Sequence, residues 1–262
     1  MTLFTKELND LKARFLILFL LIGISGYLII VYYGFFISLM DLSTIEEYLA
    51  LSPLSRYLDP ASLMQQLGLL LNNIDFYVWS QWFGKNLYQF MILSSIVLAF
   101  SSFAREAEHN TMSFLLSNFT RWQIFTSKVL AGSILLMLLV AEGCFVPFIL
   151  APAGGYSFTL LTASSYMLQM GLAAIFLYAA VIFFSILSKD VIKPIIASII
   201  FLIILSLPRF VEFLSSLYLY RYMTGFDIFI GNGVHYISML VLTILTTAIF
   251  TLAWQIFKKK DF

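Results

Sequence analysis

Charged residues are scarce in this sequence. Only 11% of the 262 residues are Asp, Glu, Lys or Arg, whereas 61% are hydrophobic, and the mean hydropathy is +0.95. A soluble domain carries about 25% charged residues, so one globular core cannot hide this much apolar surface from water. The composition excludes an ordinary soluble domain and predicts an all-α integral membrane protein, with lipid as the solvent for much of its surface.

Residues that build metal and catalytic sites are also scarce. The single cysteine, Cys144, excludes an internal disulfide, and the two histidines, His109 and His235, lie in different predicted segments. There is no His-Glu-x-x-His or Cys-x-x-Cys motif, and the one Gly-Lys pair, at 84–85, lacks the other residues of a phosphate-binding loop. We therefore expect no metal site, no cofactor, no nucleic-acid binding and no enzymatic activity in this chain.

Long apolar runs dominate the sequence instead. A membrane-spanning helix needs about 20 mostly apolar residues, and six runs qualify, of which the fifth is the weakest. The first run is too long for the apolar region of a cleaved signal peptide. We predict one transmembrane domain over 1–262, with spans at about 15–40, 86–104, 123–150, 160–187, 191–208 and 236–257.

Positive charge is distributed unequally between the loops. With six spans and both termini in the cytoplasm, the positive-inside rule is satisfied, whereas five spans would place the lysines at 258–260 outside. We therefore expect a multi-pass protein of a bacterial plasma membrane. The cytoplasmic side would then hold eleven of the fifteen basic residues, namely Lys6, Lys12, Arg14, Arg105, Arg121, Lys128, Lys189, Lys193 and Lys258 to Lys260.

The N-terminal segment, residues 1–14, has an amphipathic pattern. Its apolar side chains share one helical face, which is typical of a helix lying in the membrane interface. The alternative is a frayed tail that only supplies positive charge. The apolar residues are Leu3, Phe4, Leu8 and Leu11.

Two longer segments are predicted to be external. Residues 41–85 are mixed in character and contain Asp59, Asp75 and the pair Trp79-x-x-Trp82, which are either gate elements or interface anchors. Residues 208–235 are aromatic and apolar but interrupted by charge. This pattern suits either helices partly inserted into the outer leaflet before the last span or an interfacial aromatic belt.

One charge lies deep within a predicted span, whereas Lys128 and Lys193 lie near the cytoplasmic ends of theirs. Glu142 belongs to the third span, and a carboxylate in the membrane marks a functional site or a paired structural group. Pro147 follows it and is expected to bend the helix or end its regular hydrogen bonding. We take both as candidate residues of a transport pathway.

A charged segment, residues 105–121, separates the second and third spans. It is predicted to form one or two short helices, polar at the start and apolar further on. Exposed apolar side chains on a short helix favour docking into a groove on a partner, and the alternative is an amphipathic loop on the membrane surface. The polar residues are Arg105, Glu106, Glu108 and His109, and the apolar ones are Met112, Phe114, Leu115, Leu116 and Phe119.

The order of residues around this segment carries a resemblance. It reads Phe103-Ala104-Arg105-Glu106-x-Glu108-x-x-Thr111-Met112-x-Phe114-Leu115-Leu116-Ser117, then Thr120-Arg121-Trp122-x-Ile124 and Ser127-Lys128. This pattern resembles the segment after the second span of ABC-2 type permeases, the membrane subunits of one branch of ATP-binding-cassette transporters. The ending at 257–262 is similar to that family's aromatic-basic-Asp terminus. Asn110 stands where the family often has Gly.

The resemblance implies a mechanism and partners. Two permease subunits, identical or different, would form the pathway, and two separate ATPase subunits would bind ATP and Mg and drive export. Residues 105–121 would be the coupling helix, and residues 1–14 an elbow helix at the membrane surface. The residues that would meet the ATPase are Arg105, Glu106, Glu108, Thr111, Phe114 and Leu115, with Lys189 and Asp190 in a second, smaller contact.

Other functions stay open at this stage. A membrane scaffold would use the same segment to anchor a cytoplasmic protein, and a secondary carrier would need more intramembrane polar residues than Glu142. The substrate of an exporter is not specified by the sequence, and a peptide, a drug, a lipid-like molecule or an ion all fit.

Overall fold

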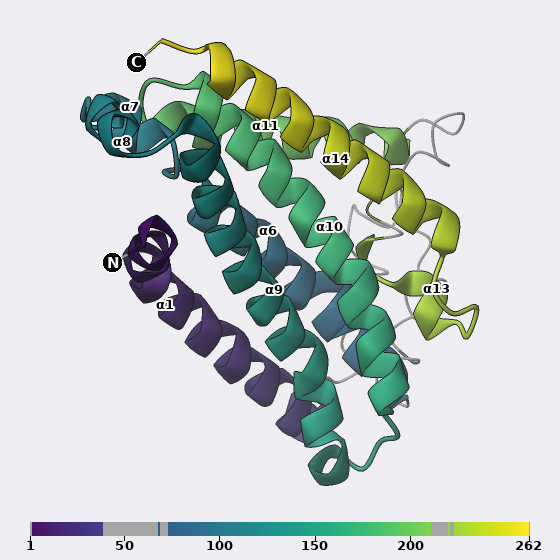
Figure 1. Cartoon of the computed structure of the whole chain (residues 1–262). Helices are drawn as coiled ribbons and strands as arrows, with labels where there is room; N and C mark the ends of the chain where they lie inside the picture. Colours follow the sequence, from purple (N-terminus) through teal and green to yellow (C-terminus); the bar gives the residue numbers. More distant parts are fainter. Residues whose placement is uncertain (1, 39–67, 69–72, 211–219, 221–222, 262) are drawn as a thin grey trace, which may run out of the picture.

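The computed structural model describes residues 2–38, 68, 73–210, 220 and 223–261, arranged as Figure 1 shows. These residues form helices and contain no strand, so the predicted all-α class is confirmed for this part of the chain. The longer helices are α1 (Leu3–Val31), α6 (Tyr88–Ala99), α9 (Arg121–Gly154), α10 (Leu160–Leu187), α11 (Ile192–Ser206) and α14 (Tyr236–Lys259). The shorter ones are α2 (Tyr33–Ser38), α5 (Ile74–Tyr77), the π-helix η2 (Val78–Leu87), α7 (Ala104–Glu108), α8 (Met112–Asn118), the 3-10 helix η3 (Leu207–Phe210) and α13 (Phe226–Phe229).

Several of these helices have the length and composition of membrane spans. Among the described residues, five helical stretches are long and apolar enough to cross a membrane: α1, the run Ile74–Glu108, α9, α10 and α14. The helix α11 is apolar but has 15 residues, fewer than the about 20 that a span needs, although η3 follows it directly. The chain therefore has the character of a multi-pass membrane protein, and the sixth span at 191–208 stays a prediction.

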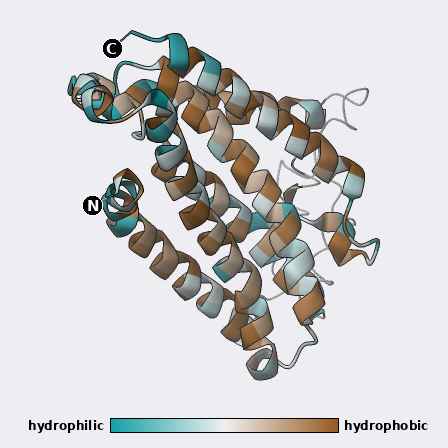
Figure 2. Ribbon diagram, viewed as in Figure 1, coloured by the Kyte–Doolittle hydropathy of each residue, from teal (hydrophilic) through white to brown (hydrophobic). Residues whose placement is uncertain are grey.

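The helices α9 and α10 lie side by side at the centre of the bundle. The helix α1 packs mainly on α9, while α10 also contacts α6, α11 and α14 and is the most enclosed span (Figure 1). Apolar residues cover the lengths of the helices, and polar residues gather where both termini, α7 and α8 lie (Figure 2). One end of the bundle is thus distinguished by its polarity.

The helix α1 is continuous across the predicted boundary between elbow and span. Thr2 caps its first turn by accepting a hydrogen bond from the backbone N–H of Thr5, and no non-helical residue follows before Tyr32. In Figure 1 its first turns point in a different direction from the rest. One stripe along its whole length is buried, so the first turns rest on protein: Leu3, Glu7, Leu11, Leu18, Ile22, Gly26 and Ile30.

The second predicted span begins earlier than expected. The elements α5, η2 and α6 follow one another without a break from residue 74, so residues 74–85 of the predicted external segment 41–85 are helical. The charge that set the predicted boundary, Lys85, lies on the exposed side of η2, whereas Trp82 and Phe83 have no exposed surface. A polar residue on one face does not end a helix whose other face is buried. Asp59 lies outside the described residues.

The last predicted external segment is described only in part. Residues 211–219 and 221–222 lie outside the described ranges, so partly inserted helices at 208–235 stay a prediction. The helix α13 packs its aromatic rings on η2: the rings of Phe226 and Phe229 lie 5.3 and 4.7 Å from the ring of Trp79. Aromatic contacts therefore hold α13 at the end of the bundle opposite to α7 and α8 (Figure 1).

The helix α9 continues through Pro147. Of the two outcomes expected at this proline, a bend or an end of the regular hydrogen bonding, the helix therefore does not end there. It runs to Gly154, beyond the predicted end of the span at about 150, and Gly155 ends it with φ 70° in the left-handed region. Pro147 has no N–H to donate to the carbonyl of Gly143. The indole Nε1 of Trp82 donates to that carbonyl instead, at 2.8 Å. A side chain of η2 thus replaces the backbone hydrogen bond that Pro147 removes from α9.

The hydrogen bond from Trp82 to the Gly143 carbonyl predicts that substitutions of Trp82 and Pro147 have non-additive effects on stability. Trp82→Phe is expected to lower the free energy of unfolding by about 1–3 kcal/mol through the orphaned Gly143 carbonyl, in addition to the lost packing. In a Pro147→Ala background the helix supplies its own N–H, so the same substitution should cost less. Thermal unfolding of the four proteins in detergent measures the difference. An equal cost in both backgrounds contradicts the assignment.

Candidate functional site

The charged segment between the second and third spans folds as two helices. The helices α7 and α8 are joined by a turn at residues 109–111, in which Asn110 has φ 55°. Asn and Gly are the residues that adopt this left-handed conformation at low cost. Of the one or two short helices predicted over 105–121, the structure has two. Thr120 caps the start of α9 and so separates that helix from α8.

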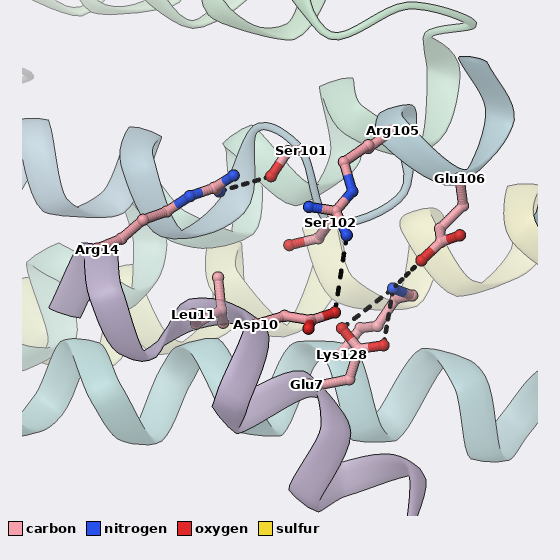
Figure 3. A pocket seen from close by; sticks show the side chains of 9 residues that line it. All are labelled: Glu7, Asp10, Leu11, Arg14, Ser101, Ser102, Arg105, Glu106 and Lys128. Carbon is pink, nitrogen blue, oxygen red and sulfur yellow. Dashed lines mark hydrogen bonds and ion pairs between the residues drawn. The ribbon is translucent and has the colours of Figure 1, made fainter. Parts of the chain in front are cut away.

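A buried ion network joins this segment to α1 and α9. Figure 3 shows Lys128 of α9 between Glu7 of α1 and Glu106 of α7. The Lys128 Nζ donates to Oε1 and Oε2 of Glu7 at 2.9 and 3.1 Å, and to Oε1 of Glu106 at 3.3 Å. The three side chains are 3%, 8% and 9% exposed. An ammonium group has three donors, and all three are directed to carboxylates from two other elements.

Two further residues complete the network. The Lys6 Nζ lies 3.9 Å from Glu7 Oε1 and 3.8 Å from Glu106 Oε1, so two cations face two carboxylates. The hydroxyl of Thr111 donates to Oε2 of Glu106, and the Thr111 N–H donates to the Glu106 carbonyl at 3.0 Å. Glu106 therefore ties the turn before α8 to the buried lysine.

The network changes the acidity of Glu106. Burial of this side chain alone would raise its pKa, but the charge of Lys128, the hydrogen bond from Thr111 and the charge of Lys6 together hold the pKa below its ordinary value of 4.5. Glu106 is therefore ionised at neutral pH.

A second polar group lies beside the first. The Nη1 of Arg14 donates to the Ser101 hydroxyl at 2.6 Å and to the Val97 carbonyl at 3.1 Å, near the end of α6 (Figure 3). Arg105 of α7 lies 3.7 Å from Asp10 of α1. The small cavity between the two groups has a volume of about 20 Å³, enough for about one water molecule.

Basic side chains also cover helix C-termini at this end. Arg121, at the start of α9, donates to the carbonyls of Phe257 and Lys260 at 2.9 and 2.7 Å. The Nζ of Lys260 donates to the carbonyls of Ile186 and Ser188 at 2.5 and 3.1 Å. Cations are favourable where unpaired carbonyls end a helix, so these contacts fix the ends of α14 and α10.

No protein-family model, curated protein or solved structure matches the chain. Among the described residues, no group of three or more His, Cys, Asp or Glu side chains has the arrangement of a metal site.

The structure divides the predicted partner-contacting residues into two groups. Glu106 and Leu115 are only 7% and 6% exposed, which corrects the expectation that their side chains face a partner. Their burial has a physical cause, since Glu106 pairs with Lys128 and Leu115 packs into the core. Within residues 105–121, the exposed residues of the predicted set are Arg105, Glu108, Thr111 and Phe114.

The link between α10 and α11 meets the segment. The Oε2 of Glu108 accepts a hydrogen bond from the Val191 N–H at 3.3 Å. Asp190 accepts from the N–H groups of Ile192 and Lys193 at 3.2 and 2.9 Å, so it serves as a cap for α11, and its hydrogen bonds to Lys193 lower its pKa. Lys189 is exposed beside it.

An open groove runs between α8 and the start of α1. It has a volume of about 470 Å³. Its lining is mainly apolar and comes from these two elements, from Arg105 and Glu106 of α7, and from the turn at 109–111. Phe114 stands at this groove and is 72% exposed, although its neighbours Ser113 and Ser117 are polar. A large apolar side chain is thus presented to the surroundings at the polar end of the bundle.

The two candidate pathway residues lie elsewhere. Glu142 is 14 residues beyond Lys128 on α9, which corresponds to roughly 20 Å along the helix. Gly23 of α1 leaves room for the Glu142 carboxylate, since a Cβ there would lie 2.8 Å from Oε1. Its Oε2 is buried and has no hydrogen-bond partner among the described residues. Pro147 and Glu142 therefore do not belong to the ion network.

Glu7 is not among the predicted site residues. The predicted apolar face of the first turns consists of Leu3, Phe4, Leu8 and Leu11, whereas Phe4 and Leu8 are only partly buried and Glu7 is buried. The spacing Leu3, Glu7, Leu11 is also helical, and a carboxylate in that stripe was the available signal for a buried ion pair.

The lowered pKa of Glu106 predicts an acid-sensitive contact. Ionised Glu106 stabilises the folded segment above about pH 4.5, and this contribution is lost as the pH falls through the lowered pKa. Amide exchange at Thr111, corrected for intrinsic rates, should stay slow from neutral pH to about pH 4.5 and accelerate below it. In Glu106→Gln exchange should be faster throughout, without this acid step. The control Glu108→Gln changes an exposed carboxylate and should keep the step, whereas loss of the step in both variants contradicts the assignment.

Proposed function

We propose that this chain is the permease subunit of an ATP-binding-cassette exporter of the ABC-2 type. The observation that carries the proposal is the exposed ring of Phe114 on α8, at the polar end of the bundle. An apolar side chain that stands among polar neighbours at this end gains stability by entering a pocket on a protein partner. An ATPase subunit is the partner that the sequence resemblance implies.

The anchoring of α7 and α8 supports the same proposal. The segment is held on one side by Lys128 and Glu7, and on the other by the hydrogen bond from Val191 to Glu108. When a partner displaces a freely moving loop, the helices beside the loop need not move. When it displaces a fixed segment, the helices that contact the segment move with it. The segment formed by α7 and α8 lies in the chain between α6 and α9. A coupling element needs such a position, because a displacement of the segment then reaches both helices.

The proposed complex contains four subunits. Two permease chains form the pathway, and two ATPase subunits bind ATP and Mg and supply the energy that this chain has no motif to obtain. The left-handed Asn110 fits the resemblance, because the family often has Gly at this turn and both residues adopt positive φ. The exported substrate is a peptide, a drug, a lipid-like molecule or an ion.

Truncation of Phe114 tests the docking surface. Phe114→Ala should weaken binding of the ATPase by about 2 kcal/mol or more, roughly 30-fold, since a central apolar anchor is lost. The matched control is Phe35→Ala, which removes another exposed ring, 58% exposed, on α2. Affinity purification from native membranes, with quantitation of the bound ATPase and its ATP hydrolysis, measures both variants.

The outcome separates the proposal from its alternative. Wild-type chain and Phe35→Ala should purify with an ATPase in equal stoichiometry. A partner without ATPase motifs, lost on Phe114→Ala, would instead assign the chain as a membrane scaffold. Charge reversal at Glu106 is a poorer test, because Glu106 is buried and its reversal would disrupt the internal ion network.

A further inference from the structure

We propose that Lys128 is a positioning residue, which fixes the orientation of α7 and α8 relative to α1 and α9 so that these four helices move as one body at this end. We call this constraint, by which the contacts of Lys128 hold α7 and α8 in one orientation, the positional lock. The lock is a property of the isolated chain, whereas its consequence for transport rests on the proposed function. Nothing in the sequence pattern assigns this role to Lys128.

The contacts of Lys128 distinguish it from the other charges nearby. It is 3% exposed and lies within 3.3 Å of both Glu7 and Glu106, whereas Lys6 is 42% exposed and lies 3.8 Å or more from the same carboxylates. Water and salt screen exposed pairs strongly and buried pairs much less. Lys128 is therefore the group that couples α1 to α7 most strongly.

Apolar contacts alone would not set the orientation of the segment. Met112 and Leu115 bury their side chains in the core, which attaches α8 to the bundle. Apolar burial is non-directional, so it permits α8 to pivot. Charge-assisted hydrogen bonds are directional and short, and those of Lys128 reach the helix immediately before the α7–α8 turn.

The lock determines which helices respond to a partner. A force applied at Phe114 passes through Thr111 and Glu106 to Lys128 on α9 and from there to Glu7 on α1. The helices α1 and α9 also pack along their lengths, with Gly23 beside Glu142. They would therefore move as a pair, and without Lys128 the link between α8 and α9 would consist of the covalent connection and non-directional apolar contacts.

Distances between spin labels test the lock in the isolated chain. In a Cys144→Ala background, one label pair at Lys12 and Ser113 reports α1 against α8, and a second pair at Lys12 and Leu130 reports α1 against α9. Wild type, Lys128→Arg and the control Lys258→Met should give one narrow distance for both pairs. Lys128→Met should broaden the first pair.

A second variant keeps the test valid if Lys128→Met does not fold. Glu106→Gln retains the contact between Lys128 and Glu7, so it should broaden the pair at Lys12 and Ser113 and leave the pair at Lys12 and Leu130 narrow. Narrow distances for Lys12 and Ser113 in Glu106→Gln, or in folded Lys128→Met, overturn the proposal.

In the complex of the permease with its ATPase, the dependence of ATP hydrolysis on the permease is a further measurement. A merely structural role of Lys128 would leave this dependence unchanged. Lys128→Met keeps Phe114 exposed, so it should still bind the ATPase but lose the dependence of ATP hydrolysis on the permease, and Lys128→Arg should restore it. Unchanged permease-dependent hydrolysis in folded Lys128→Met overturns the transmission role. If no ATPase purifies with the wild type, the proposed function fails, and the label distances still decide the lock.

Discussion

The ion contacts of Lys128 are the constraint on which the polar end of this protein depends. Two carboxylates and one ammonium group are withdrawn from water, at a cost of several kcal/mol for each ion, and their mutual contacts offset that cost only while all three remain in place. Because Glu7, Glu106 and Lys128 come from three separate helices, the ions favour one relative arrangement of α1, α7 and α9. Apolar packing alone would tolerate several arrangements.

Elsewhere in the bundle, too, polar groups that have no partner in their own helix are paired with donors from other helices. In a membrane a free carbonyl finds no water, so a neighbouring donor has to reach it. Trp82 does so at the carbonyl that Pro147 leaves free, and Arg121 and Lys260 do so at the ends of α14 and α10. Each of these contacts joins helices that are distant in sequence. Hydrogen bonds to backbone carbonyls that have no partner in their own helix thus fix how the helices of the bundle pack, which non-directional apolar contacts do not specify.

The proposed function follows from a division between a buried and an exposed part of one short segment. Glu106 and Leu115 attach the segment to the bundle, and Phe114 is left exposed. A coupling element needs both properties, because an attached segment without a free anchor binds no partner, and an anchor on a loose segment transmits no force.

The sequence by itself determined the all-α membrane character, most of the apolar helices and the place of the charged segment, because apolar runs and the charges that interrupt them are local features of the chain. It misjudged the helix starting at Ile74 and the course of α9 beyond Pro147, since buried faces and a distant indole donor compensate for local breaks. It also could not tell that Glu106 turns inward while Phe114 turns outward. Only the tertiary structure decided this, because a carboxylate becomes buried where a cation from another helix, Lys128, is there to pair with it.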